Sequence, residues 1–281
     1  MATVELPSGD KATYLTRYDH VKALLADPRF TRPTAEDGAA RIAPEGAGGP
    51  AADGTTTLAL PDRGEPHLRW RRQVGKYFTA KRMTALHDLI SMVIRESEGE
   101  GQGLTDEELL GTAMGLLVAG HETTANMIGK MVAMLLADRT RWERLLADPA
   151  LVRTAVDEAL RFDANLGFGI RRYLTEDVEV DGELLPGGTT VVCSMPAANR
   201  DERVFADADD MVLSRSPNPH LTFGAGPHAC LGQSLARTEL QVTLEVLLSK
   251  LPTLQLDVSI AELQRVEGLL VGGLRTVPVR W

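Results

Sequence analysis

Hydrophobic and polar positions change their spacing along the chain, and each spacing predicts a different kind of element. Near the start, apolar residues alternate with polar ones on both sides of the turn-forming cluster Pro7–Asp10, which predicts a β-hairpin. Alternation returns over Arg171–Val192 and after Leu254, where we expect short strands. The three-to-four-residue spacing of helices is found in the segments 18–27, 68–96, 141–146, 149–161 and 233–251.

The longest predicted helix begins after Thr105, which has capping-box spacing with Glu108, and continues to Leu136. Apolar residues occur on nearly all of its sides, so we expect it to be buried at the centre of the molecule. The polar cluster Gly120–Thr124 interrupts this apolar surface midway. A threonine there can bond a carbonyl one turn back, whereas a buried carboxylate such as Glu122 is unfavourable without a purpose.

Composition and charge narrow the class of protein. The chain has 281 residues, enough for a sizeable core, and we expect a single domain over residues 1–281. Its net charge of −9 disfavours nucleic-acid binding. We see no signal peptide and no apolar run near the ~18 residues of a membrane span, so we expect no membrane contact and a cytoplasmic location. Residues 31–57 are rich in Gly, Ala and Pro, which predicts a flexible loop.

The strongest candidate for chemistry is the segment Phe223–Gly232, which places Cys230 in a glycine-rich bend just before a helix. Glycine lets the backbone approach a large planar ligand closely, and a helix N-terminus with nearby amide donors stabilises a thiolate. A thiolate is a strong ligand for haem iron. The other cysteine, Cys193, lies in a strand-like run, where a buried structural thiol is the simpler interpretation.

Three segments, in the same order along the chain, resemble motifs of the cytochrome P450 family. Ala119–Thr124 resembles the oxygen-activating stretch of the family's long central helix, Glu158–Arg161 its Glu-x-x-Arg helix, and Phe223–Gly232 its haem-binding loop. The resemblance extends from about Val4 to the C-terminus and looks closest to bacterial members. It implies a mainly α (α+β) fold with a long central helix, small β-sheets and a loop that carries the cysteine ligand.

The resemblance also implies a cofactor, haem b (iron protoporphyrin IX), with Cys230 as the axial ligand of the iron. The residues that it places around the haem and its propionates are Ala119, Phe223, Gly224, Gly232, His67, Arg71, Arg172 and His228. A haem propionate needs cationic or hydrogen-bond-donor partners, which the histidines and arginines of this set can supply.

The family also implies roles on the distal side of the haem, where oxygen and substrate bind. Glu122 and Thr123 would relay protons, and a local distortion of the central helix beside them would form a groove for oxygen. Phe168 and Ala119 would face a small-molecule substrate.

On the cysteine side, the resemblance implies support and docking roles. Glu158 and Arg161 would lock the segment before the cysteine loop, with Arg200 or Arg215 as a further partner, although a lone pair at this spacing is otherwise a weak surface ion pair. An acidic, ferredoxin-type electron donor would dock on this proximal face. The candidate docking cations, which fit an ordinary solvated basic face equally well, are Arg69, Arg72, Lys76 and Arg237.

The chain departs from the family in length. Only 40 residues separate Phe78 from Ala119, where members of the family place several more helices. On the order of a hundred residues are therefore missing. We expect the loss between about Leu86 and Ser91, which leaves a reduced distal half with an exposed apolar face. A second copy of the chain in a homodimer, another protein or the 31–57 loop would cover that face.

The preferred function is monooxygenase-type oxidation, by hydroxylation or epoxidation, of a small organic substrate with O2 or peroxide. Water access through the reduced distal half favours peroxide use or uncoupled chemistry. One alternative is a haem-binding but catalytically weak sensor or partner subunit, against which the intact Glu122 and Thr123 argue. The other is a structural chain that no longer binds haem, against which the retained Cys230 and His228 argue.

Overall fold

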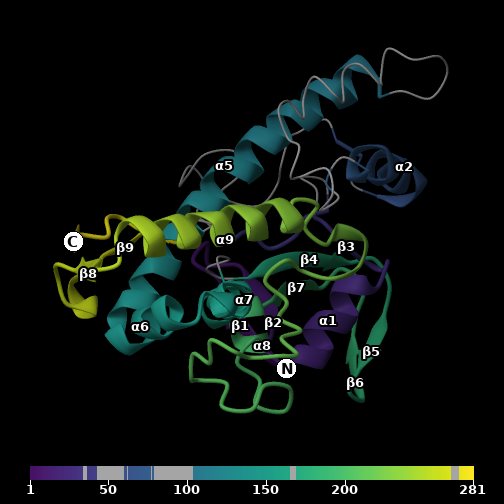
Figure 1. Ribbon diagram of the computed structural model, residues 1–281. Coiled ribbons are helices and arrows are strands. Elements are labelled where there is room, and N and C mark those ends of the chain that lie inside the picture. The colour runs from purple at the N-terminus through teal and green to yellow at the C-terminus, as the bar shows by residue number, and fades with distance from the viewer. Residues whose placement is uncertain are drawn as a thin grey trace.

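The computed structural model describes residues 1–33, 37–42, 60–61, 63–76, 78, 104–164, 169–266 and 272–281. Within them, a layer of helices lies against a β-sheet, and one long helix, α5, projects beyond both (Figure 1). Most of the predicted 31–57 loop falls outside the described residues, and so does the expected place of the internal loss, Leu86–Ser91.

The larger sheet has the strand order β1-β2-β7-β4-β3, with β2 and β7 parallel and the other neighbours antiparallel. Its strands are β1 (Ala2–Glu5), β2 (Lys11–Leu15), β7 (Thr190–Cys193), β4 (Ile170–Leu174) and β3 (Phe30–Thr31). The predicted N-terminal hairpin is β1 and β2. Helix α1 (Tyr18–Ala26) packs the buried side chains of Val21 and Leu24 into the same core as Leu174 and Val191 of the sheet.

The helical layer consists of α5 (Asp106–Ala137), α6 (Arg139–Ala147), α7 (Val152–Phe162) and α9 (Gln233–Lys250), with the short helix η1 (Pro149–Leu151) before α7. These helices agree with the predicted segments to within a few residues. They share a second core in which Met131, Trp142, Val156 and Leu244 are fully buried.

Helix α5 confirms one prediction and corrects another. The Thr105 side chain accepts from the Glu108 N–H and the Glu108 side chain accepts from the Thr105 N–H, so the capping box is present. The burial expected over its whole length is found mainly in the C-terminal half. Leu110 and Leu117, in the N-terminal half, are 66% and 64% exposed. That half extends beyond α6, α7 and α9, which surround the other (Figure 1).

Helix α2 (Gly64–Gly75) lies beside the projecting half of α5. The Trp70 indole N–H donates to the Thr112 hydroxyl at 2.9 Å. Val74, together with Trp70, packs in a small core that also contains Leu116 of α5 and Leu231. This cluster connects α2 to the central helix and to the segment that carries Cys230.

The remaining elements are short. They are the strands β5 (Val178–Val180), β6 (Glu183–Leu185), β8 (Gln255–Leu256), β9 (Arg265–Val266), β10 (Gly273–Leu274) and β11 (Val279–Arg280), with the helical turns α8 (Met195–Ala198), η2 (Gly226–His228) and η3 (Ile260–Glu262). Among the described helices, none is both long and apolar enough to cross a membrane.

Candidate active site

The Cys230 loop is built from tight backbone turns. The Cys230 N–H donates to the carbonyl of Phe223 at 2.7 Å, which closes the loop on itself. Gly224 and Gly226 both have φ of +71°, a left-handed conformation that favours glycine. A Cβ on Gly226 would lie 2.5 Å from the Cα of Ala26, the last residue of α1. Glycine at position 226 therefore permits the close approach that fixes the loop against α1.

Helix α2 holds the same loop through a second set of contacts. A guanidinium nitrogen of Arg71 donates to the carbonyl of Ala229 at 2.8 Å. Leu231 packs against Val74 in the small core, and Gly232 is the N-cap of α9. Cys230 is thus held between two anchored neighbours, immediately before a helix.

The histidines and arginines predicted to hold the haem propionates gather beside this loop. The rings of His67, on α2, and His228 stack with their centroids 4.3 Å apart. Arg172, on β4, is only 4% exposed, and burial followed by the charge of Arg32 lowers its pKa to about 10. Burial, followed by the charges of Arg32 and Arg172, lowers the pKa of His228 to about 3, so its ring is neutral near pH 7. Arg71 contributes to this positive field.

Two buried nitrogen atoms show that this cluster fits the propionates of haem. Nε of Arg172 and Nδ1 of His228 have no hydrogen-bond partner among the described residues. Buried polar atoms normally have a partner, and a carboxylate is the group that satisfies a guanidinium best. The neighbouring charge of Arg32 belongs to the same cluster, although no sequence motif points to it.

The Cys230 thiol combines exposed surface with nearby positive groups. Desolvation by the surrounding loop raises the pKa of Cys230, while the backbone N–H of Gly232 and the charges of Arg71 and Arg237 act in the opposite direction. Such an accessible sulfur can reach a metal. Cys193 differs, since it is fully buried in β7 and burial raises its pKa to about 12. Its predicted burial is confirmed.

A buried ion-pair network supports the segment before the loop. Glu158 and Arg161 of α7 are 0% exposed and joined by two hydrogen bonds of 2.8 Å. Arg215 donates to the same carboxylate at 3.0 Å, and Arg161 also donates to the carbonyls of Asn199 and Ala208. Of the two predicted partners Arg215 is correct. Arg200 instead pairs with Asp209 at the surface.

The predicted proton-relay residues lie midway along α5. The Thr123 hydroxyl donates to the carbonyl of Ala119 at 2.6 Å, the bond one turn back that a threonine makes readily. Glu122, Ala119 and Gly120 are exposed. The helix continues without a break through this stretch, so the expected distortion does not interrupt it. Phe168 lies outside the described residues.

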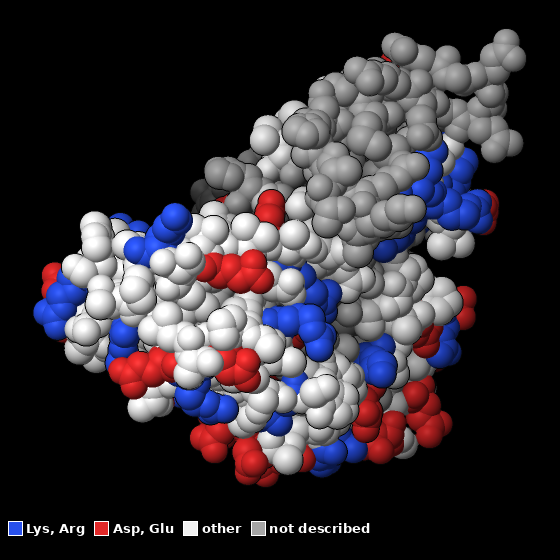
Figure 2. Space-filling model, in the orientation of Figure 1, with Lys and Arg blue, Asp and Glu red and all other residues white. Residues whose placement is uncertain are grey.

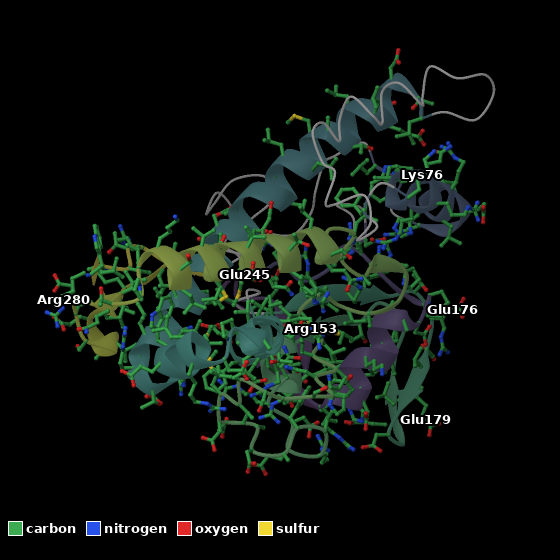
Figure 3. The ribbon with its side chains drawn as sticks, viewed as in Figure 1. Lys76, Arg153, Glu176, Glu179, Glu245 and Arg280 are labelled. Atoms are coloured by element: carbon green, nitrogen blue, oxygen red, sulfur yellow. The ribbon has the colours of Figure 1, made fainter. Side chains whose placement is uncertain are left out.

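Lysine and arginine side chains gather over α2 on one face of the molecule (Figure 2). Lys76 lies at the end of that helix (Figure 3). Three of the four candidate docking cations have acidic partners, in the pairs Arg69–Glu108, Arg72–Glu65 and Arg237–Asp157. These partners reduce the local positive charge that an acidic protein would meet.

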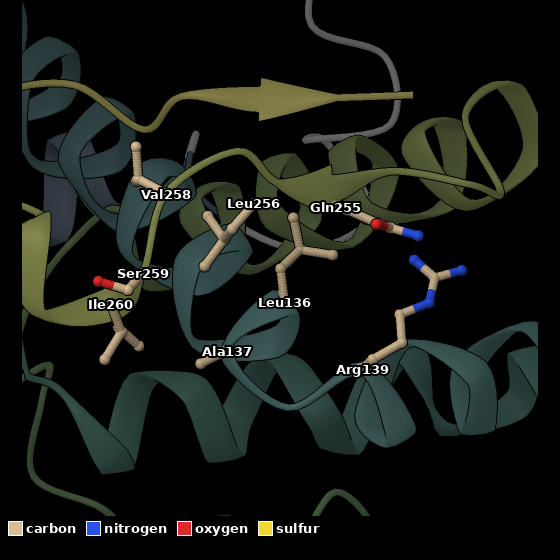
Figure 4. Close-up of a pocket in the computed structure, with 8 residues that line it drawn as sticks. All are labelled: Leu136, Ala137, Arg139, Gln255, Leu256, Val258, Ser259 and Ile260. Atoms are coloured by element: carbon tan, nitrogen blue, oxygen red, sulfur yellow. The ribbon is translucent and has the colours of Figure 1, made fainter.

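A hollow at the far end of α5 is separate from these candidates. It lies between the last turn of α5 and the segment around β8, and Leu136, Leu256 and Ile260 are among the residues that line it (Figure 4). Arg139 at its edge donates to the carbonyl of Pro252 at 2.9 Å. None of the predicted haem or relay residues lines it.

Comparison with known proteins identifies the family of this chain. Residues 68–257 match the family model described as Cytochrome P450. The nocardicin C N-oxygenase of Nocardia uniformis subsp. tsuyamanensis is 43% identical over 209 residues, which are 74% of this chain and 52% of that protein. The mycinamicin IV hydroxylase/epoxidase of Micromonospora griseorubida is 40% identical over the same shares of the two chains. The chain thus spans about half the length of the curated relatives it matches.

A solved structure of the mixed-function P450 MycG superposes with a TM-score of 0.86 and 28% identity, and the alignment covers 100% of this chain and 93% of that one. The wide structural span beside the half-length sequence match agrees with a shortening inside the chain. Since the family model covers well over half of the residues and the solved fold agrees with it, this chain belongs to the cytochrome P450 family.

Proposed function

We propose that this chain is a haem-thiolate oxidoreductase that carries out monooxygenase-type oxidation of a small organic molecule. The observation that carries the proposal is the accessible Cys230 thiol beside a cationic cluster in which Arg172 and His228 keep buried, unpartnered nitrogen atoms. Members of the family bind haem, and two relatives are named as an N-oxygenase and a hydroxylase/epoxidase. We further propose that residues 1–281 act as a single domain.

The residues divide into those that hold the cofactor and those that serve the distal side. Cys230 would bind the iron, and the propionates would be held by the His67, His228, Arg71 and Arg172 cluster. When bound, haem b supplies the redox chemistry that activates O2 or peroxide. The Gly232 N–H and the nearby arginine charges favour the thiolate form of Cys230, the form that binds metal.

Glu122 and Thr123 would supply protons on the distal side. The exposed Glu122 carboxylate can exchange protons with water, and the Thr123 hydroxyl can pass one on because it both donates and accepts. In the structure that hydroxyl is bonded to the Ala119 carbonyl, so it must turn away from the carbonyl to donate elsewhere. Ala119 and Phe168 would contact the substrate.

Partners and location complete the proposal. A ferredoxin-type donor would deliver electrons at the proximal face, and the protein would act in the cytoplasm without nucleic acid or membrane. The apolar face of α5 formed by Leu110, Met114, Leu117 and Val118 would be covered by a second copy or another protein. This exposure also favours the second candidate function, a haem-binding but catalytically weak sensor or subunit.

Isotope labelling separates the two functions. The haem-loaded chain is supplied with a ferredoxin system and 18O2, or with labelled peroxide, and a panel of small alkenes and amines. Monooxygenase function predicts product that carries one labelled oxygen atom and that Cys230→Ala does not form. Thr123→Val should lower product formed per electron consumed without loss of bound haem. Haem binding with no labelled product would support the weak-catalyst alternative.

A further inference from the structure

A second polar cluster lies between α7 and α9, behind the Cys230 loop. Asp157 of α7 accepts from Nε of Arg237 of α9 at 2.7 Å, and the same oxygen lies 3.4 Å from Nε2 of His220. The side chain of His220 is almost fully buried. Arg237 also donates to the Gln233 side chain one turn earlier, at 3.2 Å, so its guanidinium is held from two directions.

This cluster touches the loop through an aromatic ring. The guanidinium carbon of Arg237 lies over the ring of Phe223, 4.5 Å from its centroid, and the His220 ring is 5.8 Å from the same ring. The Phe223 carbonyl accepts the N–H of Cys230 at 2.7 Å. The positive charge of Arg237 is therefore linked to Cys230 through a single residue, Phe223.

The charges of the pair are fixed near neutral pH. Burial raises the pKa of Asp157, but hydrogen bonds from His220 and Arg237 outweigh it and hold that pKa below its usual value. Arg237 remains protonated, as arginine does in proteins, and its charge favours the thiolate of Cys230. Asp157 carries the opposite charge 2.7 Å from Nε of Arg237, so it would oppose the effect of that arginine on the sulfur.

We propose that Asp157 and Arg237 are positioning residues that set the reduction potential of the thiolate-bound cofactor, Arg237 raising it and Asp157 partly cancelling that effect. The proposal rests on the haem-thiolate function above. Reduction adds negative charge at the iron, so a nearby cation stabilises the reduced form and a nearby anion opposes it. The guanidinium lies over Phe223 and makes two hydrogen bonds inside the chain, which argues against Arg237 serving only to dock a partner.

The two single variants should move the potential in opposite directions. In the haem-loaded protein, Arg237→Gln is expected to lower the equilibrium constant of one-electron reduction about tenfold, which is about 59 mV. Asp157→Asn should raise the potential. The double variant should lie between the wild type and Arg237→Gln, because both charges are then absent and Asp157 cancels only part of the effect of Arg237. Arg237→Lys, which keeps the charge, should fall between the wild type and Arg237→Gln.

The potentials are measured by spectroelectrochemical titration, and the Soret band of the reduced, carbon-monoxide-bound form reports the ligand in each variant. A matched control is the exposed pair Arg17–Asp181, 2.6 Å apart, at the opposite end of α1 from the Cys230 loop. Arg17→Gln and Asp181→Asn should leave the potential unchanged. If Arg237→Gln loses haem, Asp157→Asn alone is the test. Removing a carboxylate that only supports the structure would not raise the reduction potential.

The outcomes are distinct. This inference is overturned if the reduction potential shifts in the same direction in both single variants, or stays unchanged in both, while the thiolate Soret band is kept. The proposed function is not affected by that result. An unchanged potential with a higher KM for a ferredoxin would instead make Arg237 a docking residue. A wild-type protein without the thiolate band would overturn the proposed function and this inference together.

Discussion

Replacement of Glu158 by glutamine should be among the most destabilising single changes in the chain. The carboxylate is 0% exposed and accepts hydrogen bonds from Arg161, Arg215, the Val212 N–H and the Asn218 side chain. Glutamine has nearly the same shape but no charge, and its amide N–H groups would face guanidinium donors. The buried Arg161 would then lack a counter-charge.

The magnitude follows from that uncompensated charge. Breaking a buried ion pair by removing one partner typically costs about 3–5 kcal/mol, a large part of the roughly 5–15 kcal/mol by which domains are stable. At about 2–4 °C per kcal/mol, the melting temperature should fall by about 6–20 °C. The meander from Asn199 to Asn218, which Arg161 and Glu158 hold, leads directly into the Cys230 loop, so haem retention should fall as well.

Thermal and urea unfolding, followed by near-ultraviolet circular dichroism, measure the loss. The control is Glu143→Gln on α6, where the carboxylate is 62% exposed and 3.4 Å from Arg139. That surface pair should contribute less than about 1 kcal/mol. If Glu158→Gln were no more destabilising than Glu143→Gln, the reasoning from burial would be refuted.

Three further changes test other parts of the account. Gly226→Ala places a Cβ 2.5 Å from the Cα of Ala26 on a left-handed backbone, and it should lower the free energy of unfolding by about 2–5 kcal/mol, measured by thermal unfolding. Its control is Gly232→Ala, where the Cβ meets open space and the loss should be less than about 1 kcal/mol. Thr105→Ala removes the cap of α5 and should cost about 0.5–2 kcal/mol by urea titration, with Thr105→Ser nearly neutral. The pKa of His228 is lowered from 6.5 to about 3, so between these pH values the unfolded chain binds a proton that the folded, haem-free chain does not. The free energy of unfolding should therefore fall as the pH drops from about 6.5 towards 3. A His228→Asn variant with the same pH dependence of the free energy of unfolding would contradict this.

Local signals in the sequence were sufficient for much of the fold. The capping box at Thr105 and Glu108 and the turn between β1 and β2 depend on neighbours in the chain, and both are present in the structure. The bend around Cys230 was also predictable, because its glycines meet a backbone requirement that the structure shows at Gly224 and Gly226.

Features that depend on distant partners were not predictable in the same way. The apolar composition of α5 implied burial, but burial depends on which elements surround the helix. Leu110 and Leu117 stay exposed because no described element covers their side of the helix. Arg200 and Arg215 were equivalent candidates in the sequence, and only the path of the meander brings Arg215 to Glu158. Arg32 reaches the cationic cluster for the same reason, through the course of the chain after α1.

The most direct test of the central claim is the reduced, carbon-monoxide-bound difference spectrum of the haem-loaded protein. Cys230→Ala is the test variant and Cys193→Ala the matched control, because Cys193 is buried in β7 and takes no part in the proposed site. We expect a Soret band at the family's characteristic position in the wild type and in Cys193→Ala, and its loss in Cys230→Ala. A wild-type band at the shorter, non-thiolate wavelength, or a thiolate band that survives in Cys230→Ala, would contradict it.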